Sequence, residues 1–137
     1  MNTVIERLVT AMNAHDLDAM VGLFAPDYVS RQPVHEAAAF VGASQVRANW
    51  AAMFAGVPDF RAELVRSVED GDTTWCEWRW TGLRSDGRPF DHRGVTLFEV
   101  HDGAITAGTL YMQEAEADTP IEQEVENLSG LRPDRNA

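Results

Sequence analysis

The chain has 137 residues, of which 45% are hydrophobic and 24% charged, a composition typical of a single globular domain around one core. Its formal net charge of -11 and its scattered arginines provide no basic face, so no nucleic-acid partner is expected. The N-terminus lacks the order of a signal peptide and no apolar run approaches the roughly 20 residues that span a bilayer, which predicts a cytoplasmic protein with no membrane contact.

Two short amphipathic helices are predicted at the start of the chain. The apolar positions of the first recur at helical spacing and are Val4, Ile5, Leu8 and Met12. Asp16 is a candidate N-cap for the second, whose apolar positions are Leu17, Met20, Val21 and Phe24. Pro26 ends this pattern and Pro33 closes the next segment, so the residues between them are predicted to be irregular or an edge strand.

A third helix is predicted to begin after Gly42 and to stop at Gly56 and Pro58, two residues that commonly end helices. One face of this helix carries the apolar side chains of Val46, Trp50, Met53 and Phe54. These three helices precede the strand-rich remainder of the chain, an order that favours segregated layers over alternating helices and strands.

Beyond the third helix the hydrophobic period changes to that of strands. Segments 60–69, 73–83, 90–100 and 104–113 are rich in β-branched and aromatic residues and are separated by the turn signals "EDGD", "SDGRP" and "VHDG". This pattern predicts a curved, four-stranded antiparallel meander covered on one face by the helices, hence an α+β fold.

Residues 114–137 are interpreted as an acidic C-terminal tail, with seven acidic residues against two arginines. Thr119 as N-cap, Pro120 at the first helical position and Glu122 three residues after the cap predict a short helix. Its apolar positions are Ile121, Val125 and Leu128. Either a solvated cap or a docking element for a partner agrees with this composition.

The order of several local strings resembles a known family. "NAHDLDA", "LFAPDYV", "VPDF" and "RGVTLFEVHDGAI" follow one another as in the SnoaL-like branch of the nuclear-transport-factor-2-like superfamily, over about residues 4–113. The resemblance implies one domain over residues 1–113, a cystatin-like α+β roll in which a bent sheet forms a cone around an apolar pocket. Members include polyketide cyclases, ketosteroid isomerases, epoxide hydrolases and pocket proteins without known chemistry, and the outer sheet face often forms a homodimer.

The stretch "TTWCEWRWTG", residues 73–82, holds three of the four tryptophans. Alternation places Trp78, Trp80 and the lone cysteine, Cys76, on one face of the strand, and Trp75 on the other. Cys76 has no partner cysteine and is interpreted as a small buried hydrophobe. Trp75 lies between polar neighbours on the outer face, which suits a dimer interface.

The length of the following turn decides which residues face the two inner tryptophans. A two-residue turn would place Trp80 beside Arg93, whereas a three-residue loop would place Trp80 opposite His92 and Trp78 opposite Gly94. We favour the second register because a glycine leaves volume for an indole. His92 would then lie on the concave side with Trp78 and Trp80.

The catalytic acids of the family have no counterparts at the positions that match. The isomerase base is an aspartate before a proline, and that dipeptide is Gln32-Pro33 in this chain; the oxyanion position falls at Thr96 and the helix-one tyrosine at Leu8. The aspartate that cyclases and epoxide hydrolases carry on the last strand falls near Leu110. An amide cannot abstract a proton at neutral pH, so the isomerase reaction is not expected.

Histidine is the remaining candidate for acid–base chemistry. His92 and His35 are the candidate catalytic residues, with a structural imidazole or a rim position as the alternative for each. His15 and His101 are predicted to lie at the surface. No histidine pair has metal-ligand spacing and no phosphate-binding loop is present, so neither a metal site nor a cofactor is expected.

Three interpretations of the cone remain open: an enzyme acting on a small hydrophobic metabolite, a non-catalytic binding module, or a dimeric scaffold with a filled interior. The candidate ligand-binding residues are Tyr28, Gln32, Trp50, Phe54, Trp78, Trp80, Thr96, Leu110 and Met112. Contact among the indoles of Trp50, Trp78 and Trp80 would indicate a closed cone.

Overall fold

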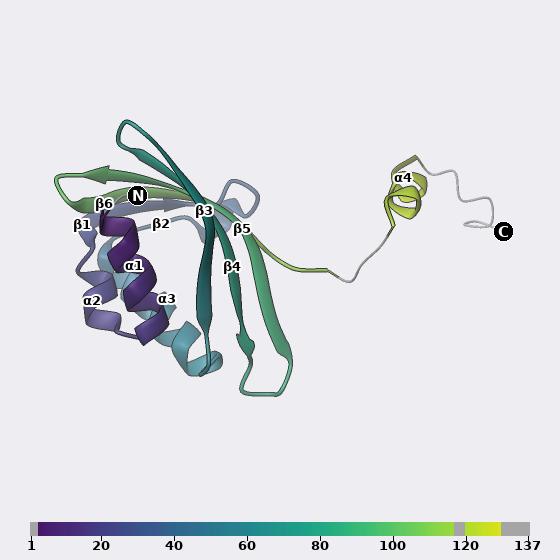
Figure 1. Cartoon of the computed structure of the whole chain (residues 1–137), viewed down its shortest axis with the longest axis horizontal. Helices are drawn as coiled ribbons and strands as arrows, with labels where there is room; N and C mark the ends of the chain where they lie inside the picture. Colours follow the sequence, from purple (N-terminus) through teal and green to yellow (C-terminus); the bar gives the residue numbers. More distant parts are fainter. Residues whose placement is uncertain (1–2, 117–119, 130–137) are drawn as a thin grey trace.

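The computed structural model describes residues 3–116 and 120–129, and it confirms an α+β fold (Figure 1). A strongly bent sheet forms one layer, and the three N-terminal helices lie on its concave side. The elements are α1 (Thr3–Ala14), α2 (Leu17–Val21), β1 (Phe24–Arg31), the 3-10 helix η1 (Glu36–Ala38), β2 (Phe40–Val41), α3 (Ala43–Gly56), β3 (Arg61–Asp70), β4 (Thr73–Leu83), β5 (Pro89–His101), β6 (Ala104–Glu114) and α4 (Ile121–Ser129). No helix in the described ranges is long and apolar enough to cross a membrane.

The sheet has six strands in the order β2-β1-β6-β5-β4-β3 and is mixed. The predicted meander of β3 to β6 is confirmed as an antiparallel unit. The prediction of an irregular segment or edge strand after Pro26 is wrong, because β1 lies inside the sheet, antiparallel to β2 and parallel to β6. The register shifts between Phe24 and Val29, so Pro26 lies in an irregular stretch where its missing N–H removes no regular ladder bond.

Helix α2 is shorter than predicted, and Phe24 belongs to β1 instead of the helical face. Asp16 is confirmed as the N-cap, since its carboxylate accepts a hydrogen bond from the Ala19 backbone N–H at 3.1 Å. The Gly22 N–H donates to the Asp18 carbonyl and closes the helix after little more than one turn. The chain therefore enters the sheet earlier than the apolar spacing indicated.

The join between α1 and α2 fastens the helices to β3. The Asn13 amide donates to the Ala62 carbonyl at 2.9 Å and accepts from the Ala62 N–H at 2.7 Å. His15 has a φ of 53°, stacks on Phe54 at 4.4 Å, and its Nε2 lies 2.8 Å from the Phe60 carbonyl oxygen. The prediction of a surface position for His15 is therefore wrong, because the left-handed backbone turns the half-buried ring onto the sheet.

The register between β4 and β5 is the predicted one, with Trp80 paired to His92 and Trp78 to Gly94. The reason given for the glycine is wrong. A Cβ on Gly94 would meet the backbone of β6 at Tyr111 and would lie 2.9 Å from the Met112 Cα, so the glycine permits the close approach of β5 and β6.

The core lies between the helices and the concave sheet face. Helix α1 contributes Ile5, Leu8 and Met12, which are almost completely buried. Helix α3 buries Val46, whereas its Trp50, Met53 and Phe54 are only half-buried. Cys76 is buried as predicted and burial raises the pKa of its thiol to about 11, although a hydrogen bond from Thr96 opposes this shift.

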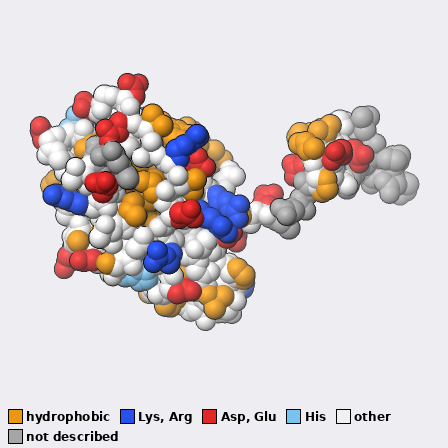
Figure 2. Space-filling view, viewed as in Figure 1, with side chains coloured by type: hydrophobic (Ala, Val, Ile, Leu, Met, Phe, Trp, Pro, Cys, Tyr) orange, Lys and Arg blue, Asp and Glu red, His pale blue; other side chains and the backbone are white. Residues whose placement is uncertain are grey.

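Helix α4 follows the sheet as a separate feature of the chain. It lies apart from the body of the protein, and its apolar side chains are visible on the surface (Figures 1 and 2). None of its residues is buried, and Leu128 is 87% exposed. The predicted N-cap, Thr119, lies outside the described residues.

Candidate functional site

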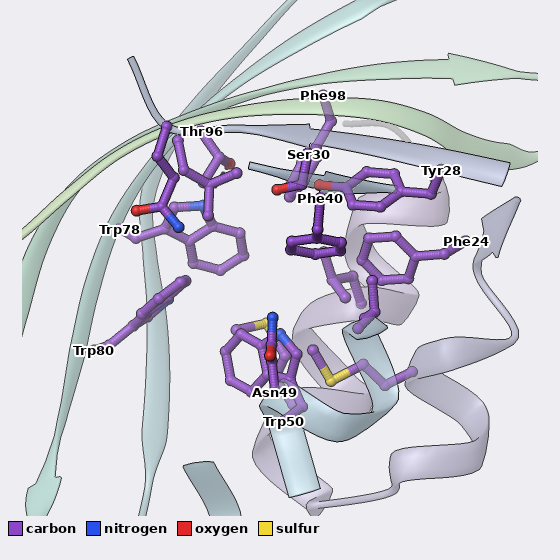
Figure 3. Close-up of a pocket in the computed structure, with 16 residues that line it drawn as sticks. Phe24, Tyr28, Ser30, Phe40, Asn49, Trp50, Trp78, Trp80, Thr96 and Phe98 are labelled. Atoms are coloured by element: carbon purple, nitrogen blue, oxygen red, sulfur yellow. Dashed lines mark hydrogen bonds between the residues drawn. The ribbon is translucent and has the colours of Figure 1, made fainter. Parts of the chain in front are cut away.

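The concave side of the sheet and the helices enclose a cavity of about 90 Å³ (Figure 3). Trp78 and Trp80 of β4 face Phe24, Tyr28 and Phe40 across this space. The lining residues are Leu8, Met12, Met20, Phe24, Tyr28, Ser30, Gln32, Phe40, Val46, Asn49, Trp50, Trp78, Trp80, Thr96, Phe98 and Leu110. None of them is aspartate, glutamate, lysine, arginine or histidine, so Tyr28 is the single ionisable group at the wall.

Three indoles fill much of the cone. The ring centroids of Trp50 and Trp80 are 5.3 Å apart in an edge-to-face arrangement, and those of Trp78 and Trp80 are 6.1 Å apart. Drug-sized ligands occupy pockets of roughly 300–1,000 Å³, and an engineered apolar cavity of about 150 Å³ holds benzene. The cavity is smaller than both, so it has room for a compact molecule at most and not for a polycyclic one, and it is not sealed, because Asn49 at its wall is exposed.

Two side chains of the cavity wall, those of Trp78 and Thr96, are held by contacts with each other and with Cys76. The Trp78 Nε1–H donates to the Thr96 hydroxyl at 2.9 Å, and that hydroxyl is hydrogen-bonded to the Cys76 thiol. All three residues are almost completely buried. Thr96 and the Trp78 N–H thus have partners within the protein and serve to fix the indole.

Tyr28 and Ser30 project from β1 into the opposite wall. Their hydroxyls are hydrogen-bonded, an interaction that lowers the pKa of Tyr28, but burial outweighs it and the pKa of the phenol is raised. Gly108 of β6 provides the space for the Tyr28 hydroxyl, because a Cβ there would overlap it. Tyr28 is therefore neutral near pH 7 and acts as a polar group, not as a charged one.

One donor at the wall has no partner in the protein. The Trp80 Nε1 atom is buried without a hydrogen bond, and His92 Nδ1 is the other such side-chain atom within the described residues. Buried polar groups are almost always paired, and an unmet donor costs about 1–3 kcal/mol. The Trp80 N–H is therefore a buried donor that the described residues leave without an acceptor, in a side chain that lines the cavity.

A second space, an open groove of about 900 Å³, lies at the mouth of the cone. Its lining residues are Gln32, His35, Met53, His92, Met112, Gln113, Glu114, Ala115 and Glu116. Because Gln32 also lines the cavity, the two spaces meet at its side chain.

His92 is half-buried in this groove and stacks on Phe90 at 4.3 Å. Burial lowers the pKa of His92, and Arg84 lowers it further, while Glu114 and Asp91 raise it. The imidazole is consequently neutral near pH 7 and can accept a proton. His35 is exposed at the same groove, and His101 is exposed as predicted, with its Nδ1 3.3 Å from Asp72.

The predicted site residues divide between the two spaces. The structure places Tyr28, Gln32, Trp50, Trp78, Trp80, Thr96 and Leu110 at the cavity, and His35, His92 and Met112 at the groove. Phe54 lines neither, because it packs on His15 and Phe60 instead. The other lining residues were not predicted as ligand-binding, among them Ser30, Phe98 and Asn49; strand alternation with Tyr28 and with Thr96 could have identified the first two of these.

The positions that match the catalytic residues of isomerases converge on the cavity. Leu8, Gln32 and Thr96 all line it, and so does Leu110 of the last strand. No aspartate or glutamate is among the residues that line this cavity. No group of three His, Cys, Asp or Glu side chains in residues 3–116 and 120–129 could hold a metal ion.

Comparison with known proteins establishes the family. Residues 5–108 match the model of the SnoaL-like domain, and the chain belongs to this family. A search of the curated proteins gave no significant match.

Solved structures share the same fold. A protein provisionally classed as a polyketide cyclase from Sinorhizobium meliloti is 26% identical, with 82% of this chain and 95% of that chain covered and a TM-score of 0.65. IdmH, provisionally classed as a polyketide cyclase from Streptomyces antibioticus, is 22% identical, with 92% and 96% covered and a TM-score of 0.71. AclR from Streptomyces galilaeus, provisionally classed as a hydroxylase, is 15% identical, with 98% and 95% covered and a TM-score of 0.75.

Proposed function

We propose that this SnoaL-like protein binds a compact, mainly apolar molecule that carries one hydrogen-bond acceptor, such as a ketone oxygen, in the inner cavity. The observation that carries the proposal is the buried Trp80 Nε1–H, a donor without a partner in a wall made of aromatic and aliphatic side chains. Such a wall favours apolar ligands, and the donor selects those with an acceptor.

The same wall favours binding over acid–base chemistry inside the cavity. Proton transfer requires a group whose pKa lies near the working pH, and the cavity offers only a phenol with a raised pKa and neutral amides and hydroxyls. The positions at which relatives would carry a base or an acid hold Gln32 and Thr96. A ligand held there would not meet a group able to take its proton.

A second candidate function is acid–base catalysis at the mouth of the cone. The observation that favours it is His92, which is neutral near pH 7 and has a buried Nδ1 without a partner. If His92 is a catalytic base, His92→Gln lowers turnover by roughly 10²- to 10⁴-fold and leaves ligand affinity nearly unchanged. Equal loss of affinity and turnover would make it a binding residue instead.

The binding proposal can be tested with a matched pair of ligands. Cyclopentanone presents a carbonyl oxygen, and methylenecyclopentane has nearly the same shape with a CH₂ group in its place. Because a hydrogen bond to a buried donor contributes about 1 kcal/mol, we expect the ketone to bind about fivefold more tightly by calorimetry. Trp80→Phe should abolish this preference, and Trp75→Phe on the outer face should preserve it.

Two outcomes would contradict this proposal. Binding of neither ligand at millimolar concentration would leave the cone as a filled core. Equal affinities for the two ligands would mean that the Trp80 N–H does not select an acceptor.

We also propose a homodimer through the outer face of the sheet. Val65, Val68 and Tyr111 are about half exposed on the strands there, and Trp75 is half-buried beneath the Arg66 guanidinium, which lies 5.4 Å from its ring. Aromatic and arginine side chains together are typical of interfaces. Trp75→Glu should yield a monomer in sedimentation analysis while Val34→Glu, outside the strands, does not; an unchanged species would exclude Trp75 from an interface.

A further inference from the structure

The cavity and the mouth groove are lined by the same four parts of the chain. Each part lines the cavity and, a few residues away, also lines the groove. The residues are Ser30 of β1 with Gln32 just after the strand, Trp50 and Met53 on α3, Thr96 and His92 on β5, and Leu110 and Met112 on β6. On β5, Gly94 lies between Thr96 and His92.

The two unpartnered buried nitrogens belong to residues that are neighbours in the sheet. Trp80 lines the cavity, His92 lines the groove, and the two residues are direct cross-strand partners in β4 and β5. Residues paired in this way on one face are neighbours, with Cβ atoms about 5 Å apart. Trp80 Nε1 can donate a hydrogen bond, and the Nδ1 of a neutral His92 can accept or donate one.

The groove has the properties of a subsite for a neutral, flexible chain. Met53 and Met112, both half-buried, supply an adaptable apolar surface on opposite walls. Glu114 and Glu116 stand at the same groove, and Glu114 is 3.7 Å from Arg84, so an anionic ligand would meet acidic side chains there. The groove therefore disfavours an anionic ligand, and the cavity, whose wall has no charged side chain to pair with an ion, favours an uncharged one.

We propose that the cavity and the groove are two parts of one site for an elongated neutral ketone or ester. Its compact head occupies the cavity, its carbonyl oxygen lies at Trp80 and His92, and its alkyl chain extends along Met53 and Met112. This inference rests on the proposed binding function of the cavity, to which it adds the length, the charge and the orientation of the ligand.

The test compares cyclopentanone with 2-pentylcyclopentanone and 2-heptylcyclopentanone, in which the chain leaves the carbon next to the carbonyl. Each methylene buried from water contributes a factor of about three to four in affinity, so we expect the pentyl chain to raise the affinity about 100-fold or more. Met53→Gln and Met112→Gln should each weaken the pentyl ketone about tenfold and leave cyclopentanone unchanged. Val41→Gln, at an exposed valine of β2, is the matched control.

The outcomes separate this inference from the proposal on which it rests. An equal affinity of all variants for cyclopentanone would show that each variant is folded and that its cavity is intact. Suppose that cyclopentanone binds but that the alkyl chain adds no affinity, or adds affinity that both methionine variants retain. Either result would show that the extended site is wrong, and the cavity proposal would stand. If none of the three ketones binds the unaltered protein, both proposals fail.

Discussion

Thr96 is a single residue that holds the Trp78 indole in place inside the cone. Its hydroxyl accepts the Trp78 N–H and is hydrogen-bonded to Cys76, so the position that matches an oxyanion donor in isomerases serves to hold an indole in place. Thr96→Val would leave the buried Trp78 Nε1 without a partner. We expect a loss of about 1–3 kcal/mol in the free energy of unfolding by urea denaturation.

Thr109→Val is the control for this change. Thr109 lies on β6 away from the cavity lining, and its substitution tests the general effect of valine in a strand. A Thr96→Val protein as stable as the unaltered protein would show that the hydrogen bond contributes nothing to the fold.

The lowered pKa of His92 makes stability depend on pH. The folded protein binds a proton at this site less readily than the unfolded chain, whose histidines titrate near pH 6.5. As the pH falls from about 6.5 through the lower pKa of the folded state, the unfolded state binds more protons and stability is lost. His92→Gln should reduce the loss measured between pH 7 and pH 5, whereas an equal loss in both proteins would contradict the burial of this imidazole.

Gly94 allows two elements, the strands β5 and β6, to approach each other closely. Because a Cβ at this position would meet the β6 backbone, Gly94→Ala should force the two strands apart. We expect destabilisation well above the 0.5–1 kcal/mol by which alanine and glycine ordinarily differ in a strand, measured by thermal or urea unfolding. Gly56→Ala at the end of α3, where no atom lies within 4 Å of the added Cβ, should change stability little.

The elements differ in how much of them the sequence could predict. The order of helices and meander strands followed from local period, turn signals and the cap at Asp16, all of which depend on near neighbours. The inner position of strand β1 was not predicted, because Pro26 within it and Pro33 after it indicated an edge, and because its parallel partner, β6, lies far along the chain. The left-handed turn at His15 was missed for a similar reason, since its contact with Phe60 depends on the tertiary fold.

The candidate site was only partly predictable. Alternation placed Trp78 and Trp80 correctly on the inner face, and the turn length placed His92 opposite Trp80. The size of the cavity could not be predicted, because it depends on how the ring of Trp50, from a helix, packs against Trp80, from a strand. The division into cavity and groove depends on the same packing.

At the scale of the whole molecule, the acidic segment after the sheet is predicted to be independent of the folded domain. No described residue of α4 is buried, so a chain ending at Glu116 should lose none of the apolar contacts of the core. We expect the truncated protein to unfold at the same temperature and denaturant concentration as the full chain. A lower midpoint would show that the tail packs on the domain and would shift the domain boundary.

The cone contains a small apolar cavity, and we propose that its buried Trp80 N–H binds an acceptor there. The most direct measurement is the indole N–H spectrum of ¹⁵N-labelled protein during a cyclopentanone titration, with each of the four signals assigned by a Trp→Phe variant. The account predicts a saturable downfield shift of the Trp80 signal, as expected for a new hydrogen bond, with the Trp75 signal unchanged and no downfield shift with methylenecyclopentane. A Trp80 signal that does not move at saturating ketone, or that moves equally with both ligands, would contradict it.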